Sequence, residues 1–258
     1  MPSFAANLTF LFGEHPFLER FAAARAAGFT RVEYMFPYDY EPAELRARLD
    51  EHGLEQVLFN LPAGDWAQGD RGIAADPGRV DEFRAGVERA REYAHALDVP
   101  RLNCLAGTRG DRATLLANLR HAAQRLAEDG RTLLLEPVNT RDIPGFLVPT
   151  SAVAVELLDA AAEPNLRLQF DVYHAQVMEG DLVNRLRALL SRIGHVQIAD
   201  NPGRHQPGTG EIDYAFVLKE LDAMGYAGTV GLEYVPEPDT LASLGWLERY
   251  GAITTGER

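Results

Sequence analysis

The sequence lacks several features that each mark a particular class of protein. Its 258 residues include a single cysteine, Cys104, which excludes an internal disulfide bond and a zinc site built from cysteines. The N-terminus has no basic stretch ahead of an apolar core, and no apolar run is long enough to cross a bilayer. These absences predict a soluble, cytoplasmic protein that does not associate with membranes.

Basic side chains are also in the minority. There are 25 Lys and Arg residues against 38 Asp and Glu residues, and the formal net charge is -13. A surface that binds nucleic acid needs clustered Lys and Arg, so we expect no nucleic-acid partner. The charge does not argue against a small acidic substrate, because an acidic protein can still carry a local basic pocket.

The apolar residues indicate alternating strands and helices. No linker or low-complexity segment interrupts the chain, and 46% of its residues are hydrophobic, so we expect one domain over residues 1–258. Apolar residues three and four apart indicate helices, and glycines stand where these end. The expected strands are residues 3–12, 31–36, 54–60, 101–107, 131–137, 166–172, 193–200 and 229–235. The expected helices are residues 17–28, 41–53, 77–98, 112–130, 150–161, 182–194 and 213–225.

This alternation predicts an α/β fold, and more closely a (β/α)8 TIM barrel. Eight strands separated by helical segments, in roughly 250 residues, match the size of that barrel. A doubly wound open sheet shares the alternation and is the main alternative. Its glycine-rich phosphate loop should follow the first strand, where this sequence has "FLFGEHP" instead. We therefore favour the barrel.

Four polar side chains stand where strands of the second half end, about one strand–helix unit apart. They are Glu136, Asp171, Gln197 and Glu233. In a barrel the carboxyl ends of the strands meet at one rim, where the chemistry of this fold takes place. Three carboxylates facing one centre repel each other unless a cation lies between them. Carboxylate and amide oxygens suit Mg²⁺ or Mn²⁺, and the lack of thiolates disfavours a structural zinc.

Each of these residues alone has an ordinary structural explanation. A glutamate after a strand is most often a solvated loop residue, Asp171 can cap the next turn, and Gln197 can be a hydrogen-bonded core amide. Their joint spacing favours a shared site. His195 lies two residues before Gln197 and should face the same side, so spacing alone leaves its imidazole an equal or better ligand. His174, close to Asp171 in "DVYH", is expected either beside the substrate or on the surface.

Several longer stretches resemble the xylose isomerase-like barrel superfamily and, within it, the hydroxypyruvate isomerases. They are "FAANLTFLF", "FLERFAAARAAGF", "VEYMFPYDY", "LEPVNTRDIPGF", "FDVYHAQ", "GHVQIADNPGRHQPGTGEIDY" and "GLEY", in the family's order. The resemblance covers essentially the whole chain. It implies a TIM barrel with a divalent metal that converts hydroxypyruvate into 2-hydroxy-3-oxopropanoate (tartronate semialdehyde), an aldose–ketose isomerisation.

The resemblance also implies roles for individual residues. The implied ligands of the metal, Mg²⁺ or Mn²⁺, are Glu136, Asp171, Gln197 and Glu233. Glu136 and Glu233 would also be the catalytic acid–base groups. In related ketose epimerases the third ligand position holds a histidine, so Gln197 favours the hydroxypyruvate isomerases. His174 and Arg204 match positions that hold substrate oxygens in these relatives.

The substrate is expected to be a small hydroxy or oxo acid. Its carboxylate needs a donor, which Arg204, His205 or His174 can provide, and the bidentate geometry of arginine favours Arg204. Moving a proton between adjacent carbons requires an enediolate, and two glutamates on opposite sides of the substrate can share this work. The sequence does not say which glutamate acts first.

Residues of the first three strands complete the candidate site. Asn7, together with Glu33 and Asn60, is expected to orient the substrate or to support the ligands. The aromatic residues Phe36, Tyr38 and Trp66 are expected either to cover the pocket or to pack at the rim or in a subunit interface.

Other functions remain open on the same scaffold. A 2-oxo-tetronate isomerase or a ketose 3-epimerase is the nearest alternative, and a 3-dehydroshikimate or inosose dehydratase is a more distant one. A metal-dependent DNA-repair nuclease would need more metal-binding side chains than seven histidines readily supply, and a basic groove. A barrel that binds a ligand without catalysis is a further alternative. By analogy with the family, which often pairs its barrels, we expect a homo-oligomer.

Overall fold

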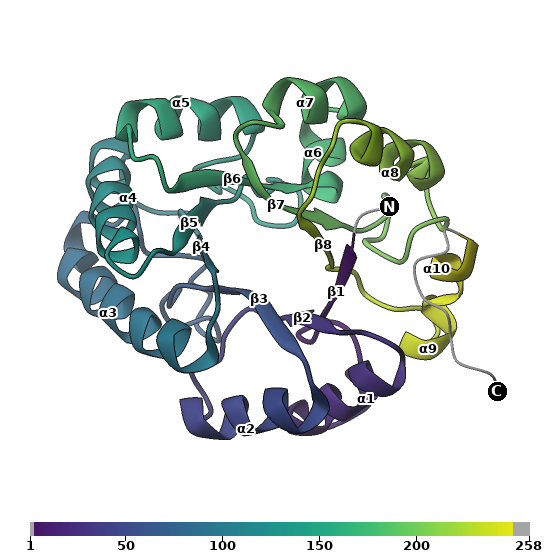
Figure 1. Cartoon of the computed structure of the whole chain (residues 1–258). Coiled ribbons are helices and arrows are strands. Elements are labelled where there is room, and N and C mark those ends of the chain that lie inside the picture. Colours follow the sequence, from purple (N-terminus) through teal and green to yellow (C-terminus); the bar gives the residue numbers. More distant parts are fainter. Residues whose placement is uncertain (1–2, 250–258) are drawn as a thin grey trace.

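The computed structural model describes residues 3–249 and confirms the predicted TIM barrel. Eight parallel strands form a closed ring in sequence order, and the helices surround it (Figure 1). The strands are β1 (Ser3–Asn7), β2 (Arg31–Glu33), β3 (Glu55–Asn60), β4 (Arg101–Cys104), β5 (Thr132–Leu135), β6 (Leu166–Asp171), β7 (Ile193–Ile198) and β8 (Thr229–Leu232). The helices are η1 (Phe17–Glu19), α1 (Arg20–Ala26), α2 (Pro42–His52), η2 (Pro77–Arg79), α3 (Val80–Leu97), α4 (Arg112–Ala127), α5 (Ser151–Ala161), α6 (Val172–Met178), α7 (Leu182–Leu189), α8 (Tyr214–Ala223), α9 (Thr240–Ser243) and α10 (Gly245–Arg249).

The outer helices follow from the apolar spacing and from their end residues. In α3 the buried side chains Phe83, Val87 and Ala94 recur at helical spacing, so one stripe packs on the barrel. Asp111 begins α4 by accepting a hydrogen bond from the backbone N–H of Thr114 at 2.8 Å. The burial of these stripes against the strands forms the main apolar core, which leaves the inner rim of the barrel for polar groups.

Seven of the eight strands end one to five residues before the predicted end, and only β3 ends where predicted, at Asn60. The strand expected over residues 3–12 ends at Asn7, because the carbonyl of Asn7 accepts hydrogen bonds from the backbone N–H groups of Phe10 and Leu11 at 3.1 and 2.8 Å. The predicted strand was too long because the apolar pattern continues beyond this turn, where Leu11 is buried as well. The short helix α6 was not predicted. It begins directly after Asp171, whose carboxylate accepts from the N–H of Tyr173 at 2.7 Å.

Strand register brings the polar strand ends together. Asn7 of β1 lies opposite Glu33 of β2, and Asp171 of β6 lies opposite Gln197 of β7. Gln197 in turn lies opposite Gly231 of β8, two residues before Glu233. Residues far apart in the sequence therefore meet at one end of the barrel.

The extent of the predicted domain is tested only in part. Residues 1–2 and 250–258 lie outside the described residues, so one domain over residues 1–258 stays a prediction. Within residues 3–249, no helix combines the length and the apolar composition needed to span a bilayer.

The polar loop after β7 is organised by one buried carboxylate. Asp200 accepts hydrogen bonds from the backbone N–H groups of Asn201, Gly208, Gly210 and Ile212, at 2.9, 2.8, 2.9 and 3.1 Å. A side chain at Gly210 would place its Cβ 2.2 Å from the carbonyl oxygen of Asn201. The loop therefore needs both the carboxylate and this glycine to close on itself. The segment that it closes carries Arg204 and His205.

We expect Asp200→Asn to lower the free energy of unfolding by about 2–4 kcal/mol, measured by urea denaturation. The amide NH₂ introduced by this change meets backbone N–H donors, which then lose their acceptor in a buried position. Asp213→Asn is the control, because asparagine serves equally well as the first residue of a helix, and α8 should tolerate it with a loss under about 0.5 kcal/mol. Equal losses in the two variants would contradict this account of the loop.

Candidate active site

Each of the eight strands supplies one buried polar side chain at or next to its carboxyl end. In strand order they are Asn7, Glu33, Asn60, Asn103, Glu136, Asp171, Gln197 and Glu233. The four predicted metal ligands are all members of this ring. Because the top of a TIM barrel is the place where strand ends converge, the ring defines the candidate active site.

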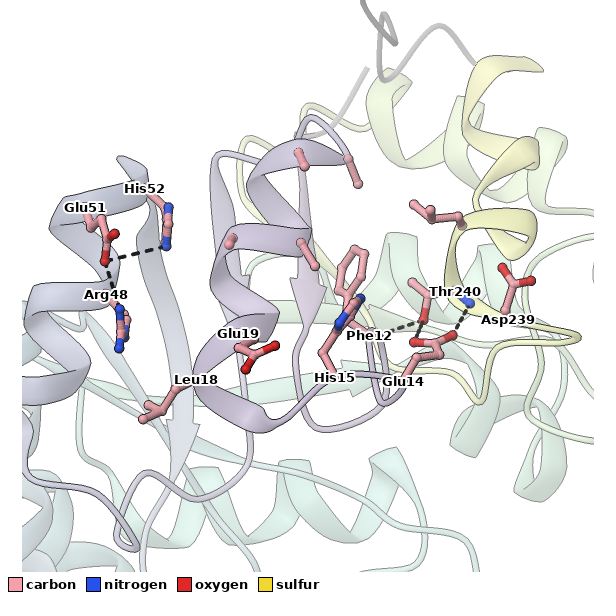
Figure 2. Close-up of a pocket in the computed structure, with 15 residues that line it drawn as sticks. Phe12, Glu14, His15, Leu18, Glu19, Arg48, Glu51, His52, Asp239 and Thr240 are labelled. Atoms are coloured by element: carbon pink, nitrogen blue, oxygen red, sulfur yellow. Dashed lines mark hydrogen bonds and ion pairs between the residues drawn. The ribbon is translucent and has the colours of Figure 1, made fainter. Parts of the chain in front are cut away.

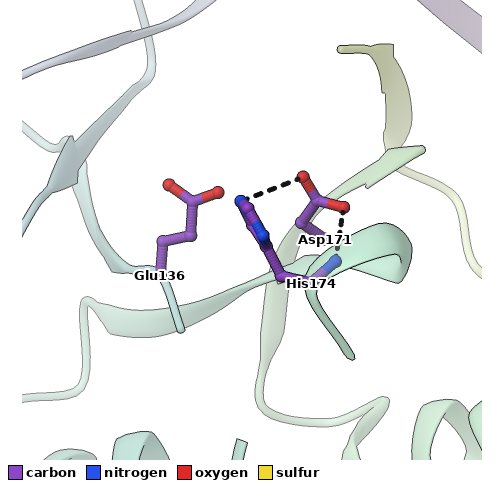
Figure 3. Close-up of side chains that lie close together, drawn as sticks. All are labelled: Glu136, Asp171 and His174. Carbon is purple, nitrogen blue, oxygen red and sulfur yellow. Dashed lines mark hydrogen bonds and ion pairs between the residues drawn. The ribbon is translucent and has the colours of Figure 1, made fainter. Parts of the chain in front are cut away.

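The closest group of potential metal ligands in the described residues is formed by Glu136, Asp171 and His174. One ligand atom from each lies within 4.8 Å of the others (Figure 3). Oδ1 of Asp171 accepts from the backbone N–H groups of Tyr173 and His174, at 2.7 and 3.4 Å. Oδ2 is buried and makes no hydrogen bond within residues 3–249, although Nε2 of His174 lies 3.8 Å away. One oxygen of Asp171 thus remains for a further partner.

The protonation of His174 follows from its neighbour Asn139. The amide oxygen of Asn139 accepts from the backbone N–H groups of Arg141 and Asp142, at 3.0 and 2.8 Å. Its NH₂ group therefore faces Nδ1 of His174, 2.7 Å away, and donates to it. Burial lowers the pKa of His174 well below its ordinary value, and the charge of Arg204 adds to this effect. The neutral ring then carries its proton on Nε2 and presents it as a donor at the rim.

Glu233 is held from two sides. Its Oε1 accepts a hydrogen bond from Nη2 of Arg204, and its Oε2 accepts from the amide groups of Gln197 and Asn7, at 2.5 and 3.1 Å. The guanidinium of Arg204 also lies over the rings of Phe10 and Tyr173, 5.1 and 5.3 Å from their centroids. The predicted substrate residues Arg204 and Asn7 are therefore both in contact with the predicted catalytic residue Glu233.

The side-chain amide of Gln197 turns its nitrogen, and not its oxygen, toward the carboxylates of the site. Its nitrogen donates to Glu33 at 2.7 Å and to Glu233, while its oxygen accepts from the amide of Gln169 at 2.6 Å. Amide orientation is assigned from such a network. The role of Gln197 as a metal ligand stays a prediction, and it requires the amide to turn over. His195, the alternative ligand, contacts Glu33 at 2.7 Å instead of the group around Asp171.

The carboxyl groups of the site hold protons more tightly than usual. Burial, and then the charge of Asp171, raise the pKa of Glu136 to about 8. Burial also raises the pKa of Glu233 well above its ordinary value and that of Asp171 to a lesser degree, whereas the charge of Arg204 opposes both shifts. One guanidinium therefore does not fully compensate the three carboxylates.

This set of residues fits a divalent cation. The donors are mainly oxygens, which hard cations such as Mg²⁺ and Mn²⁺ prefer. Oδ2 of Asp171 has no hydrogen bond in the described residues, and His174 and Arg204 approach it only to 3.8 Å. A cation would fill this place and would also relieve the raised pKa values of Glu136 and Glu233.

The other predicted substrate residue, His205, lies with the loop after β8. Its Nδ1 lies 2.9 Å from the carbonyl oxygen of Val235, and its Nε2 lies 3.7 Å from Glu237. These contacts do not bring it together with the carboxylates, and its binding to substrate stays a prediction. Asn60 accepts from Asn103 at 3.3 Å and is part of the ring.

The predicted aromatic cover has two parts. Phe36 and Trp66 contact each other with ring centroids 5.2 Å apart, and the guanidinium of Arg71 lies 4.2 Å from the Trp66 ring. Tyr38 instead packs against Tyr93 and donates its hydroxyl hydrogen to the carbonyl of Asn60. Tyr38 therefore belongs to the rim packing.

A large pocket of about 980 Å³ lies outside the barrel, between α1, α2 and the segment around α9 (Figure 2). Glu14 links two parts of its wall. The carboxylate of Glu14 accepts hydrogen bonds from the backbone N–H and the hydroxyl of Thr240, at 2.6 and 3.0 Å. None of the predicted site residues lines it. The pocket offers no cluster like that at the strand ends, which remain the candidate active site.

Several supporting residues were missed in the sequence. Asn139 orients His174, Asn103 donates to Glu136 at 2.8 Å, and Gln169 holds the amide of Gln197. Gln169 and Asn103 each stand between two apolar neighbours within a strand, and this signal was available. Asn139 carried no such signal, because it lies in a loop whose path the sequence does not reveal.

Comparisons with known proteins agree with this geometry. The family model described as "Xylose isomerase-like TIM barrel" matches residues 21–250. The chain is 47% identical to the 2-oxo-tetronate isomerase of Cupriavidus necator, covering 97% of this chain and 99% of the relative. It is 48% identical to the hydroxypyruvate isomerase of Escherichia coli, covering 97% and 100%. A crystal structure of an AP endonuclease, family 2, from Brucella melitensis superposes with a TM-score of 0.94 at 45% identity, covering 97% and 99%.

The chain belongs to the xylose isomerase-like TIM barrel family and, within it, to the group of hydroxypyruvate and 2-oxo-tetronate isomerases. The predicted resemblance is thereby confirmed, and so is the prediction that the chain is an enzyme of the isomerase class.

We expect the metal-free protein to lose stability as the pH rises from about 5 to about 8, with a fall in Tm on the order of 5 °C. Folding raises the pKa of Glu136 from its ordinary 4.5 to about 8, so the folded state binds the proton that the unfolded chain has released. Its stabilising contribution is complete below the unfolded pKa and is lost as the pH passes the folded pKa. Differential scanning calorimetry after chelation measures this.

Glu136→Gln is the control for this pH dependence, because it removes the titrating group and should flatten the profile. Added Mn²⁺ should raise Tm more at high pH than at low pH, since ionised carboxylates bind the cation. A flat profile for the metal-free wild-type protein would show that the buried carboxyl group does not titrate as described.

Proposed function

We propose that the protein is a metal-dependent aldose–ketose isomerase that converts hydroxypyruvate into 2-hydroxy-3-oxopropanoate through an enediolate. The observation that carries this proposal is the pair of buried glutamates, Glu136 on β5 and Glu233 on β8, whose pKa values are raised. The name of the Escherichia coli relative, at 48% identity, supports the substrate.

The two glutamates have the properties that a proton transfer between adjacent carbons needs. In the metal-free site Glu136 has a pKa of about 8 and holds a proton at neutral pH, and a bound cation, which lowers this pKa, favours the carboxylate that can take a proton from carbon. One glutamate removes the proton from carbon and the other group returns a proton to the neighbouring carbon. The direction of the reaction decides which of them begins.

Other residues orient the substrate. The Nε2–H of His174 points to the rim and is placed to donate to a substrate oxygen. Arg204 is the proposed partner of the substrate carboxylate, because its Nε–H makes no hydrogen bond within the described residues while Nη2 holds Glu233. Contacts with the rings of Phe10 and Tyr173 stabilise the position of the guanidinium.

The proposed holders of the divalent metal, Mg²⁺ or Mn²⁺, are Glu136, Asp171, Gln197 and Glu233. A bound divalent cation supplies electrostatic stabilisation for the negative charge that develops on the enediolate oxygens. Asp171 contributes the oxygen that lacks a hydrogen bond, and Gln197 joins the set only with its amide turned over.

A 2-oxo-tetronate isomerase is the second candidate. It uses the same residues on a substrate one carbon longer, and the name of the Cupriavidus necator relative, 47% identical, favours it. The partner of the protein is then again a small hydroxy or oxo acid. The word endonuclease in the name of the Brucella melitensis protein is not carried over, because a formal charge of -13 opposes contact with DNA phosphates.

The experiment that tests the proposal is a direct assay of both acids. Chelated protein is reloaded with Mg²⁺ or Mn²⁺, and product from hydroxypyruvate and from a 2-oxo-tetronate is followed by NMR. Turnover of hydroxypyruvate supports the proposal, whereas turnover of the tetronate alone moves the protein to the second candidate. Equal rates with and without metal would refute metal dependence.

We expect Glu136→Gln and Glu233→Gln each to lower kcat by about 10²–10⁴-fold, because glutamine cannot exchange the proton. Steady-state kinetics on the metal-loaded variants measures this. Glu55→Gln is the matched control, because this glutamate is exposed at the opposite end of β3, away from the strand ends that form the site. Wild-type rates in Glu136→Gln or Glu233→Gln would exclude that residue as an acid–base group.

A further inference from the structure

Glu33 is a buried carboxylate at the end of β2 that the proposed reaction does not use. It is 0% exposed, and no arginine or lysine is among its hydrogen-bond partners in the described residues. Three side-chain nitrogens surround it instead. The amide nitrogens of Asn7 and Gln197 lie 3.0 and 2.7 Å from its Oε1, and Nε2 of His195 lies 2.7 Å from its Oε2. Burial of a carboxylate that is held only by side-chain donors costs free energy of folding. This cost indicates that Glu33 has a function in the site.

Two of these donors are shared with Glu233. The same amide nitrogens of Asn7 and Gln197 also reach Oε2 of Glu233, at 3.1 and 2.5 Å. Each NH₂ group has two hydrogens and can serve both carboxylates at once. Glu33 therefore fixes the direction of both amides: with their nitrogens toward Glu33, they also face Glu233.

The neighbouring strands are shaped to seat Glu33. A Cβ at Gly231 of β8 would lie 2.3 Å from Oε1 of Glu33 and 2.5 Å from its Oε2, so any side chain there would displace the carboxylate. Gly231 lies opposite Gln197 in the sheet, and His195 lies two residues before Gln197 on the same strand. The carboxylate of Glu33, on β2, is thus enclosed by residues of β7 and β8.

We infer that Glu33 is a positioning residue that orients the acid–base group Glu233 through the bridging amide of Asn7, and through that of Gln197 as long as the Gln197 amide keeps its nitrogen toward both carboxylates and does not turn over to bind a metal. This inference rests on the proposed function, in which Glu233 moves a proton. With Oε2 held by the two amides, Oε1 stays with Arg204 at the substrate side. The length of the Glu33 side chain, and not its charge alone, then matters.

The test compares Glu33→Asp, which keeps the charge but is too short to reach the amides, with Gly231→Ala, which displaces an unaltered Glu33. Both variants should lower kcat by about 10–100-fold with KM changed by less than about threefold, because a misplaced group costs rate more than binding. Calorimetric titration of the chelated proteins with Mn²⁺ should show weaker binding, since Glu233 is a proposed ligand. Glu55→Asp, an exposed glutamate at the opposite end of β3, is the matched control and should behave as wild type.

The outcomes separate the inference from the proposed function. Wild-type kcat and wild-type Mn²⁺ affinity in Glu33→Asp would overturn it, since charge alone would then suffice. A fall in kcat that matches the loss of folded protein, with Mn²⁺ affinity per folded site unchanged, would also overturn it. Should wild-type protein turn over neither acid, the proposed function fails, and Mn²⁺ affinity in the Gly231→Ala and Glu33→Asp variants alone decides the inference.

Discussion

The mutual repulsion of buried carboxylates is the constraint on which the arrangement of the site depends. Four of them, Glu33, Glu136, Asp171 and Glu233, lie at the ends of different strands in one closed ring. Removing each from water is costly, and each raises the energy of its neighbours. The polar residues around them are best understood as the donors that make this concentration of negative charge tolerable.

The carboxylates are stabilised in different ways, and this gives them different chemical properties. Glu33 is fully buried and is contacted by side-chain nitrogens of Asn7, Gln197 and His195. Asp171 is held on one oxygen by the first turn of α6 and leaves the other oxygen without a hydrogen bond. Glu136 accepts from the amide of Asn103, but burial dominates and keeps its proton affinity high. The members of one ring of carboxylates thus differ in hydrogen bonding and in proton affinity.

The sequence predicted what depends on local spacing. The alternation of strands and helices indicated the barrel, and single polar residues at the ends of apolar strands indicated Glu136, Asp171 and Glu233. It could not predict contacts between strands that are distant in the chain. Glu33 and His195 are 162 residues apart, and only the closure of the barrel brings them to 2.7 Å. The direction of the Gln197 amide was equally out of reach, because it depends on Glu33 and Gln169 at once.

The anchoring of the loop after β7 by Asp200 has a consequence for divergence among related enzymes. The carboxylate binds four backbone N–H groups and no side chain, so it stabilises a loop shape and not a loop sequence. Apart from the glycines at positions 203, 208 and 210, which have a positive φ or no room for a Cβ, the anchor does not depend on the identity of the side chains there. Arg204 is carried by this loop, and its guanidinium contacts the carboxylate of Glu233. Related enzymes can therefore diverge in the side chains of this loop while its shape, and the carboxylates on the strands, stay the same.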